Sequence, residues 1–204
     1  MNLGSAEGLE GLTIGRLARE LQMSKSGLFA HFGSKEELQL AAVDVARAIF
    51  VDKVMERALA APPGIARLQA MLEAWVAYVE RSVFKGGCFF AAASAECDGR
   101  PGRVRDQVAR LTRSWLDALE AEIRQARSLL QLRSRIDPEQ LAFEVHALVQ
   151  EANWAYQLLR KKRVFERARE GIRHRLERAA TRRGLRQLRD RRTASRTARN
   201  ARGR

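Results

Sequence analysis

The polar run Ser24-Lys25-Ser26-Gly27 carries residue types that are well suited to contact a nucleic acid. Serine hydroxyls donate and accept hydrogen bonds, the Lys25 ammonium is a cation with three donors, and Gly27 allows close approach of the backbone. Such groups can reach base edges and phosphates in the major groove of DNA. The alternative is a polar turn on the surface of an ordinary helical hairpin, and the run alone does not decide between the two.

Residues that could support catalysis or bind a metal are sparse. The three histidines, His31, His146 and His174, lie far apart, and none has a second His or Cys at metal-ligand spacing. Cys88 could be a nucleophile, but no partner singles it out, and a structural thiol is the commoner role. The sequence contains no phosphate-binding Gly-rich loop and no nucleophile elbow. We therefore expect no enzyme activity, no metal and no cofactor.

An aromatic set in the middle of the chain is the candidate for binding an apolar small molecule. Ligand pockets between helices are mostly apolar and hold a few polar groups. Ordinary core packing explains any one of these residues equally well. The set comprises Trp75, Tyr78, Phe89, Phe90, Trp115, Trp154 and Tyr156, together with His146, which lies among apolar residues.

Two helix starts, ten residues apart, must position the polar run. Ser24 can cap a short helix that buries Leu28 and Phe32 and ends at Gly33. Ser34 can then cap the next helix. In this arrangement the first turn of the short helix points the polar residues away from the core.

The segment before the polar run predicts another helix. In the run TIGRLAREL the apolar residues share one face, and Thr13 is the expected N-cap. A helix, a tight turn and a short helix with a polar leading edge form the helix-turn-helix pattern, whose second helix enters the DNA major groove. Helical periods also dominate the rest of the chain. We expect an all-α fold with further helices over residues 35–59, 64–82, 103–126, 138–159 and 164–180.

The segment LTIGRLARELQMSKSGLFAHFGSKEELQLAAVDVA resembles the DNA-binding domain of TetR-family transcriptional regulators. Weaker similarity continues through GGCFFAAASAECDGRPGRVRDQV and DPEQLAFEVHALVQEANWAYQLL, to about residue 180. The residues that carry the main resemblance are Thr13, Leu17, Ala18, Met23, Ser24, Leu28, His31, Phe32, Lys35, Glu36 and Leu38.

The resemblance implies that two parts of the chain have different functions. Residues 1–48 would form the helix-turn-helix DNA-binding domain, and residues 49–180 a helical domain that binds an effector and dimerises. The effector pocket would draw on the aromatic set, without the resemblance saying which members line it. The implied DNA-contacting residues are Thr13, Ser24, Lys25, Ser26, Gly27, Phe29, His31 and Lys35.

Three departures from the family pattern carry consequences. Gln22 stands where the family has Gly, and a left-handed residue with a Cβ costs about 1 kcal/mol there. Phe29 replaces a Tyr and lacks the hydroxyl that could reach a phosphate. The leader MNLGSAEGLEG supplies only the last turn of the family's first helix, so either the start is mis-assigned or the domain is poorly supported. We expect incomplete cover over Leu17, Leu21, Leu28 and Phe32.

The charge of +14 is concentrated at the C-terminal end. Nineteen Lys and Arg against 4 Asp and Glu lie from Arg160 to Arg204, a net of +15, which leaves 19 basic and 20 acidic residues in 1–159. Residues 181–204 hold too few large apolar side chains to fold alone, so we expect a disordered tail. It could be an arm that binds DNA phosphates or the product of a shifted reading frame, and either should bind polyanions non-specifically.

Composition narrows the remaining function classes. No apolar stretch approaches the ~20 residues of a membrane span, and no signal peptide is evident. Two cysteines make a disulfide framework improbable and fit a cytoplasmic protein.

What the resemblance implies is a homodimer on a palindromic operator, a default role as repressor, and release by an unknown small-molecule effector. In that dimer helices 137–159 and 164–180 would pair with their copies as a four-helix bundle.

Two alternatives remain open on the sequence. The chain could be a small-molecule-binding helical protein that has lost specific DNA binding. It could also be a polyanion or membrane-surface binder driven by its basic tail.

Overall fold

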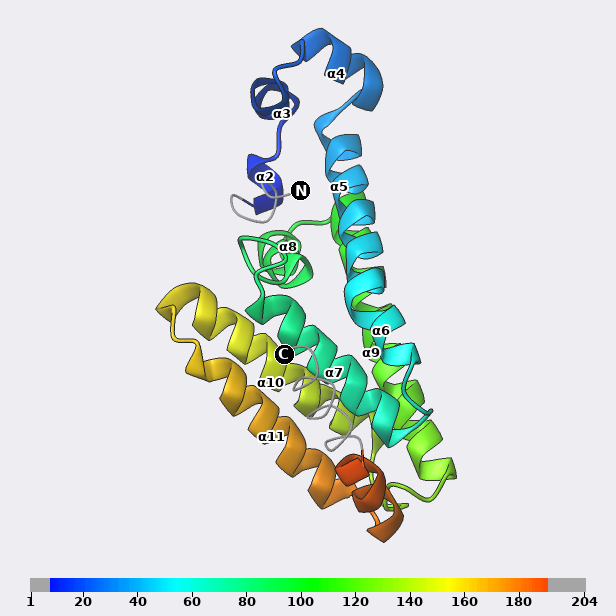
Figure 1. Ribbon diagram of the computed structural model, residues 1–204. Helices are drawn as coiled ribbons and strands as arrows, with labels where there is room; N and C mark the ends of the chain where they lie inside the picture. Colours follow the sequence, from blue (N-terminus) through cyan, green and yellow to red (C-terminus); the bar gives the residue numbers. More distant parts are fainter. Residues whose placement is uncertain (1–7, 191–204) are drawn as a thin grey trace. The chain divides into compact units, whose positions relative to one another are not determined.

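The computed structural model describes residues 8–190, and in that range every regular element is a helix apart from one isolated β-bridge between Leu132 and Ala180 (Figure 1). This confirms the expected all-α class. A further helix spans residues 182–190. The preceding elements are α2 (Gly8–Gly11), α3 (Ile14–Leu21), α4 (Lys25–Phe32), α5 (Lys35–Phe50), the π-helix η1 (Val51–Met55), α6 (Glu56–Leu59), α7 (Ile65–Glu80), α8 (Phe89–Cys97), α9 (Arg103–Ser128), α10 (Pro138–Leu159) and α11 (Arg163–Ala179).

The chain folds into two compact units. The first holds the residues up to Asp52 together with Tyr78–Trp115, and the second holds Lys53–Ala77 and the residues from Leu116 onward. These units are not consecutive in the sequence, because α7 and α9 each contribute residues to both. The domain limits at residues 48 and 180 that the resemblance implies therefore remain a prediction.

The helix boundaries follow the local signals in the sequence closely. The run expected at 35–59 is helical throughout, but it contains a π-helical turn at Val51–Met55 that the sequence did not predict. The later helices begin and end within about two residues of the expected positions. Asp137 caps α10 by accepting a hydrogen bond from the backbone N–H of Glu139, 3.0 Å away, with Pro138 in the first turn.

The cover over the helix-turn-helix is uneven, in partial agreement with the expectation. Leu28 is only 5% exposed, and Leu17 and Phe32 are half-buried. Leu21 is 52% exposed. The buried residues Leu9 and Leu12, in and just after α2, belong to the same unit, and the Gln39 side-chain amide donates to the Leu9 carbonyl oxygen at 2.6 Å.

In the second unit, Gln131 joins three segments that are distant in the sequence. Its side-chain oxygen accepts the backbone N–H of Ile65 at 2.9 Å, at the start of α7. Its backbone carbonyl accepts the backbone N–H of Thr181, also at 2.9 Å. Gly184 packs against the same carbonyl, so closely that a Cβ at this glycine would lie 2.1 Å from the oxygen.

These contacts correct the expectation of a disordered tail that begins at residue 181. Residues 182–190 form a helix, and Leu188 buries its side chain. The apolar contact of Leu188 and the fixed position of Thr181 supply the anchoring that composition alone did not reveal. The remainder of the expected tail, residues 191–204, lies outside the described residues.

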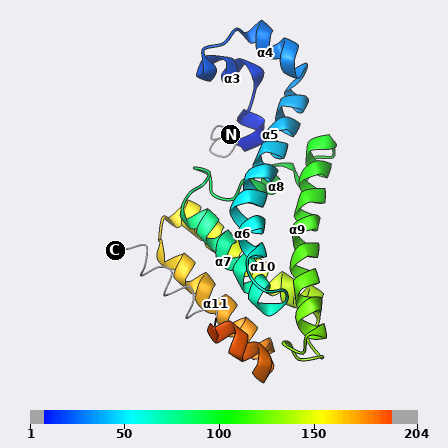
Figure 2. The same ribbon diagram turned by 45° about the vertical axis from the view of Figure 1, so that its right-hand side comes forward.

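Helices α10 and α11 lie side by side in both views of the ribbon (Figure 2). The stripe that faces the interior of this unit consists of Leu141, Val145, Ala152, Ile172 and Leu176, all buried. Among the helices of residues 8–190, none combines the length and apolar character that crossing a bilayer would require.

Candidate nucleic-acid interface

Local hydrogen bonds build the α3–α4 motif as the sequence indicates. The Thr13 hydroxyl oxygen accepts the backbone N–H of Arg16 at 3.2 Å, and the Ser24 hydroxyl oxygen accepts that of Gly27 at 3.1 Å. Between the two helices Gln22 adopts the left-handed conformation, with φ 53° and ψ 35°. The caps therefore confirm both predicted helix starts, and Gln22 occupies the strained position expected of it.

The first turn of α4 presents its polar groups to solvent. Lys25, Ser26 and Gly27 are exposed, whereas Leu28 fixes the opposite face in the core. A Cβ at Gly27 would lie 2.9 Å from the Ser24 hydroxyl oxygen, so a side chain there would disturb the cap. The turn thus offers a cation, a hydroxyl and an accessible backbone at one end of a helix, which suits contact with base edges and nearby phosphates.

Two further predicted contacts extend this surface along α4. Phe29 is 55% exposed and carries no polar atom on its ring, so any DNA contact it makes is apolar, as with a thymine methyl group. His31 is exposed and meets the ring of Phe32 edge-on, with 4.7 Å between the ring centroids. Thr13, by contrast, is half-buried and uses its hydroxyl within the chain as a cap.

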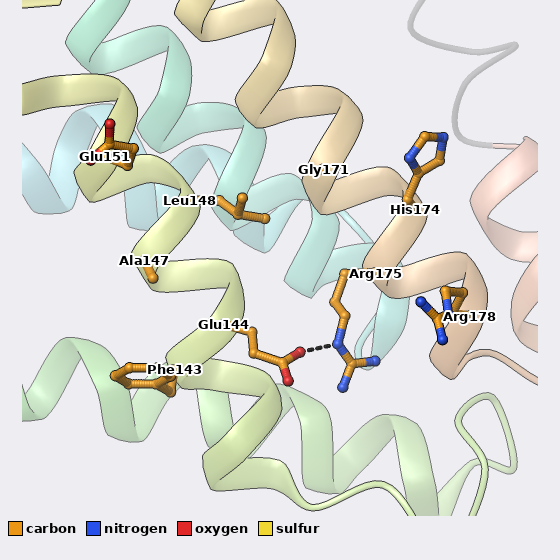
Figure 3. Close-up of a pocket in the computed structure, with 9 residues that line it drawn as sticks. All are labelled: Phe143, Glu144, Ala147, Leu148, Glu151, Gly171, His174, Arg175 and Arg178. Atoms are coloured by element: carbon orange, nitrogen blue, oxygen red, sulfur yellow. Dashed lines mark hydrogen bonds and ion pairs between the residues drawn. The ribbon is translucent and has the colours of Figure 1, made fainter. Parts of the chain in front are cut away.

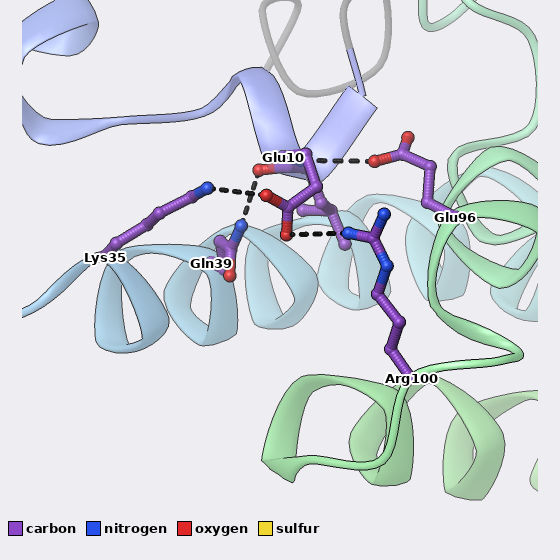
Figure 4. Close-up of polar contacts among 6 residues, drawn as sticks. Glu10, Lys35, Gln39, Glu96 and Arg100 are labelled. Atoms are coloured by element: carbon purple, nitrogen blue, oxygen red, sulfur yellow. Dashed lines mark hydrogen bonds and ion pairs between the residues drawn. The ribbon is translucent and has the colours of Figure 1, made fainter.

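Lys35, which the resemblance places near a phosphate, is bound within the chain (Figure 4). Its ammonium lies 2.8 Å from a carboxylate oxygen of Glu10, and the other Glu10 oxygen lies 3.6 Å from the guanidinium of Arg100. The bond to Lys35 is the main reason why the pKa of Glu10 lies below its usual value. The carboxylate therefore stays ionised, and the cluster stays charged, at neutral pH.

A second set of ion pairs joins the start of α5 to the start of α9. The Arg103 guanidinium lies 3.2 Å from Glu36 and 2.5 Å from Glu37. One turn further along α9 and two turns further along α5, the Gln107 amide donates to Asp44. These partners are separated by more than 60 residues in the chain. No local pattern could have revealed them, which is why the sequence analysis missed both Arg100 and Arg103.

Most of the aromatic candidates in the first unit gather around Phe50, which the sequence analysis overlooked. The Phe50 ring meets Tyr78, Phe90 and Trp115 edge-on, with centroid distances of 5.6, 6.0 and 5.1 Å. Phe89 joins through Phe90 at 5.6 Å. The buried Tyr78 hydroxyl has no hydrogen-bond partner among the described residues, and burial raises the pKa of this phenol. A buried donor without an acceptor is the kind of group that a ligand could satisfy.

The remaining aromatic candidates lie in the second unit. The rings of Trp75 and His146 lie 5.0 Å apart and 33° from parallel. Burial lowers the pKa of His146, which favours a neutral imidazole at pH 7. Trp154 is 57% exposed on α10 and takes no part in either buried group. Within residues 8–190, no three His, Cys, Asp or Glu side chains come together as metal ligands would.

Two family models match the chain. Residues 1–42 match the model described as "Bacterial regulatory proteins, tetR family". Residues 64–172 match the model described as "Tetracyclin repressor-like, C-terminal domain". A comparison with curated proteins found no match.

Solved structures share the fold over most of their length. A TetR transcriptional regulator from Chloroflexus aurantiacus is 23% identical, with 88% of this chain and 90% of that chain covered and a TM-score of 0.77. A TetR-family regulator from Streptomyces coelicolor is 24% identical, with 87% and 90% covered and a TM-score of 0.75. AibR, solved with isovaleryl coenzyme A and operator DNA, is 24% identical, with 83% and 89% covered and a TM-score of 0.66.

Proposed function

Since this chain belongs to the TetR family of transcriptional regulators, we propose that it is a repressor that reads its operator through the first turn of α4. Members of this family bind operator DNA and small effectors and are not enzymes, and the C-terminal part of this chain is the effector-binding domain. The observation that carries the proposal is the exposed run Lys25, Ser26 and Gly27 on a capped helix that Leu28 anchors in the core.

Release from DNA is proposed to follow effector binding. A ligand that binds one conformation better than another shifts the population toward that conformation, and the shift lowers operator affinity if the recognition helices lose their spacing. The unpartnered Tyr78 hydroxyl beside the Phe50 ring is a proposed effector contact. AibR, a protein of the same fold, was solved in complex with isovaleryl coenzyme A and operator DNA, so this fold can bind both kinds of partner. The proposed location is the cytoplasm, where operator DNA is accessible.

The protein is further proposed to act as a homodimer on a palindromic operator. In the two helices that the sequence suggested for dimerisation, 137–159 and 164–180, the apolar residues Leu141, Val145 and Leu176 are buried inside the protomer. Exposed apolar side chains instead follow the outer face of α10 at Phe143, Trp154 and Leu158.

A groove of about 570 Å³ runs beside this outer face, between α10 and α11 (Figure 3). It is lined by Phe143, Ala147, Leu148, Glu151, Gly171 and His174, among others. Leu148 lies over Gly171, and a Cβ on Gly171 would lie 3.1 Å from a methyl carbon of the Leu148 side chain. An apolar ridge beside a groove fits a self-complementary interface with a second copy.

The proposed reading surface can be tested with the double variant Lys25→Ala and Ser26→Ala. Loss of one good base contact should reduce the preference for the DNA flanking its own gene over random DNA by about 1–3 kcal/mol. Fluorescence anisotropy on both DNAs at several salt concentrations measures this preference. Lys161→Ala, which removes an exposed positive charge from the second unit, is the matched control and should leave the preference unchanged.

The same measurement separates the recognition helix from the basic C-terminal end. A chain that stops at Asp190 should bind both DNAs more weakly and with a flatter salt dependence, since each neutralised phosphate contributes about 0.9 to the log–log slope. If this truncation abolishes the operator preference while the double variant retains it, α4 is not the reading element and the proposal fails.

A further inference from the structure

We propose that the Glu10 carboxylate competes with DNA phosphates for Lys35, and that Arg100 weakens this competition by sharing the carboxylate. The inference rests on the proposed function, since it concerns the phosphate contact expected of Lys35. It assigns a role in DNA affinity to two residues outside the helix-turn-helix.

The geometry places one anion between two cations (Figure 4). Lys35 lies 2.8 Å from one oxygen of Glu10, and Arg100 lies 3.6 Å from the other. All three side chains are substantially exposed. A phosphate that approaches the Lys35 ammonium therefore also approaches the negatively charged Glu10 carboxylate, which is bound to that ammonium. Both repulsion from that charge and loss of the existing bond reduce the gain from the phosphate contact.

The position of Glu10 is fixed by its backbone. Glu96 on α8 accepts the backbone N–H of Glu10 at 3.1 Å, and Gln39 on α5 donates to the carbonyl of the preceding residue, Leu9. Gly8 permits the close approach of α8, because a Cβ at Gly8 would lie 2.2 Å from the Glu96 carboxylate. Glu10 is therefore held beside Lys35 from two helices.

Arg100 determines how much of the Glu10 charge remains for Lys35. It lies in the connection between α8 and α9, so its distance from Glu10 depends on where that connection lies. When Arg100 is close, it neutralises part of the carboxylate, and Lys35 is freer to meet a phosphate. When Arg100 withdraws, Glu10 binds Lys35 alone and DNA affinity falls.

This arrangement would couple ligand binding at the aromatic cluster, meaning the rings around Phe50, to DNA affinity. Helix α8 begins with Phe89 and Phe90 of that cluster and ends at Cys97, three residues before Arg100. A ligand that moves the α8–α9 connection relative to α2 would change the Arg100–Glu10 distance. Affinity would then change through charge, without any change in the residues that read bases.

The test uses the full chain and two variants with opposite expected signs. Glu10→Gln keeps a hydrogen-bond acceptor for Lys35 but removes the charge, and should tighten binding to operator and random DNA alike by about two- to fivefold at low salt. Arg100→Gln should weaken binding to both DNAs by a similar factor. Glu139→Gln removes an exposed carboxylate of α10 in the second unit and controls for net charge. Anisotropy titrations at low and high salt give the affinities, and the gain should shrink as salt rises.

Repeating the measurement in a Lys35→Gln background shows whether the Glu10→Gln effect acts through Lys35. There the effect of Glu10→Gln should largely disappear, because no ammonium remains to compete for. Weaker binding by Glu10→Gln, an equal gain from Glu139→Gln, or a gain that survives in the Lys35→Gln background would each overturn the proposal. Because the effect is expected on random DNA too, it stays measurable even if the chain shows no operator preference, an outcome that would count against the proposed function alone. Should Glu10→Gln fail to fold, Arg100→Gln decides: its weakening of DNA binding should largely disappear in the Lys35→Gln background, and an undiminished effect there would overturn the proposal.

Discussion

Gln22 holds the turn between α3 and α4 in a conformation that favours glycine. Its φ of 53° lies in the left-handed region, where a Cβ meets the following carbonyl oxygen, and its backbone N–H donates to the carbonyls of Ala18 and Arg19. The sequence already indicated this strain, since the similar family pattern has Gly at this point. The conformation was thus predictable from the family resemblance at this one position.

Replacement of this residue should stabilise the protein. We expect Gln22→Gly to raise the free energy of unfolding by about 1 kcal/mol, because glycine adopts the left-handed conformation without the Cβ penalty. For a chain of this size that corresponds to roughly 2–4 °C in a thermal melt. Glu20→Gly, inside α3, is the control and should lower stability by about as much. A lower melting temperature for Gln22→Gly would contradict the strain argument.

At the scale of elements, local signals predicted the helices and failed where distant segments meet. The caps at Thr13, Ser24 and Ser34 depend on residues three positions apart, so the sequence shows them directly. The bonds of Arg100 and Arg103 join segments more than 60 residues apart in the sequence, and no spacing rule reports them. The π-helical turn after Phe50 also carries no composition signal. The fold class and the capped, exposed first turn of α4 were therefore predictable, whereas the ion pairs around Lys35 were not.

The packing of the helix at 182–190, which the composition of the sequence did not predict, can be tested at Gly184. Gly184→Ala would place a Cβ 2.1 Å from the Gln131 carbonyl oxygen, and a backbone group cannot move aside cheaply. We expect a loss of about 1–3 kcal/mol of stability, as for overpacked cores. Gly99→Ala is the matched control, because a Cβ there meets open space and should change little. Urea unfolding curves measure both, and equal midpoints for the two variants would show that the helix is not anchored.

At the scale of the whole molecule, exposed apolar side chains on α10 predict self-association. Trp154→Glu places a charge in the proposed interface, and the symmetry of a dimer places it there twice. The loss of a central Trp alone commonly lowers the free energy of association by about 2 kcal/mol or more. Sedimentation at micromolar concentration should shift from dimer to monomer. Leu59→Glu, an equally exposed apolar position on α6, is the control and should remain dimeric. An unmodified protein that sediments as a monomer would refute the dimer itself.

The contacts of Gln131 have a consequence for the order in which the second unit is completed. Its side chain binds Ile65 across 66 positions, and its carbonyl binds Thr181 across 50. Synthesis runs from the N-terminus, so the first partner already exists when Gln131 is made, whereas the second is still to come. Closing such long loops is slow, and until residues 181–184 are made the Gln131 carbonyl lacks the two donors that Thr181 supplies in the fold. The last steps of folding therefore await the basic C-terminal segment, and a nascent chain halted before Thr181 would keep this edge of its core open.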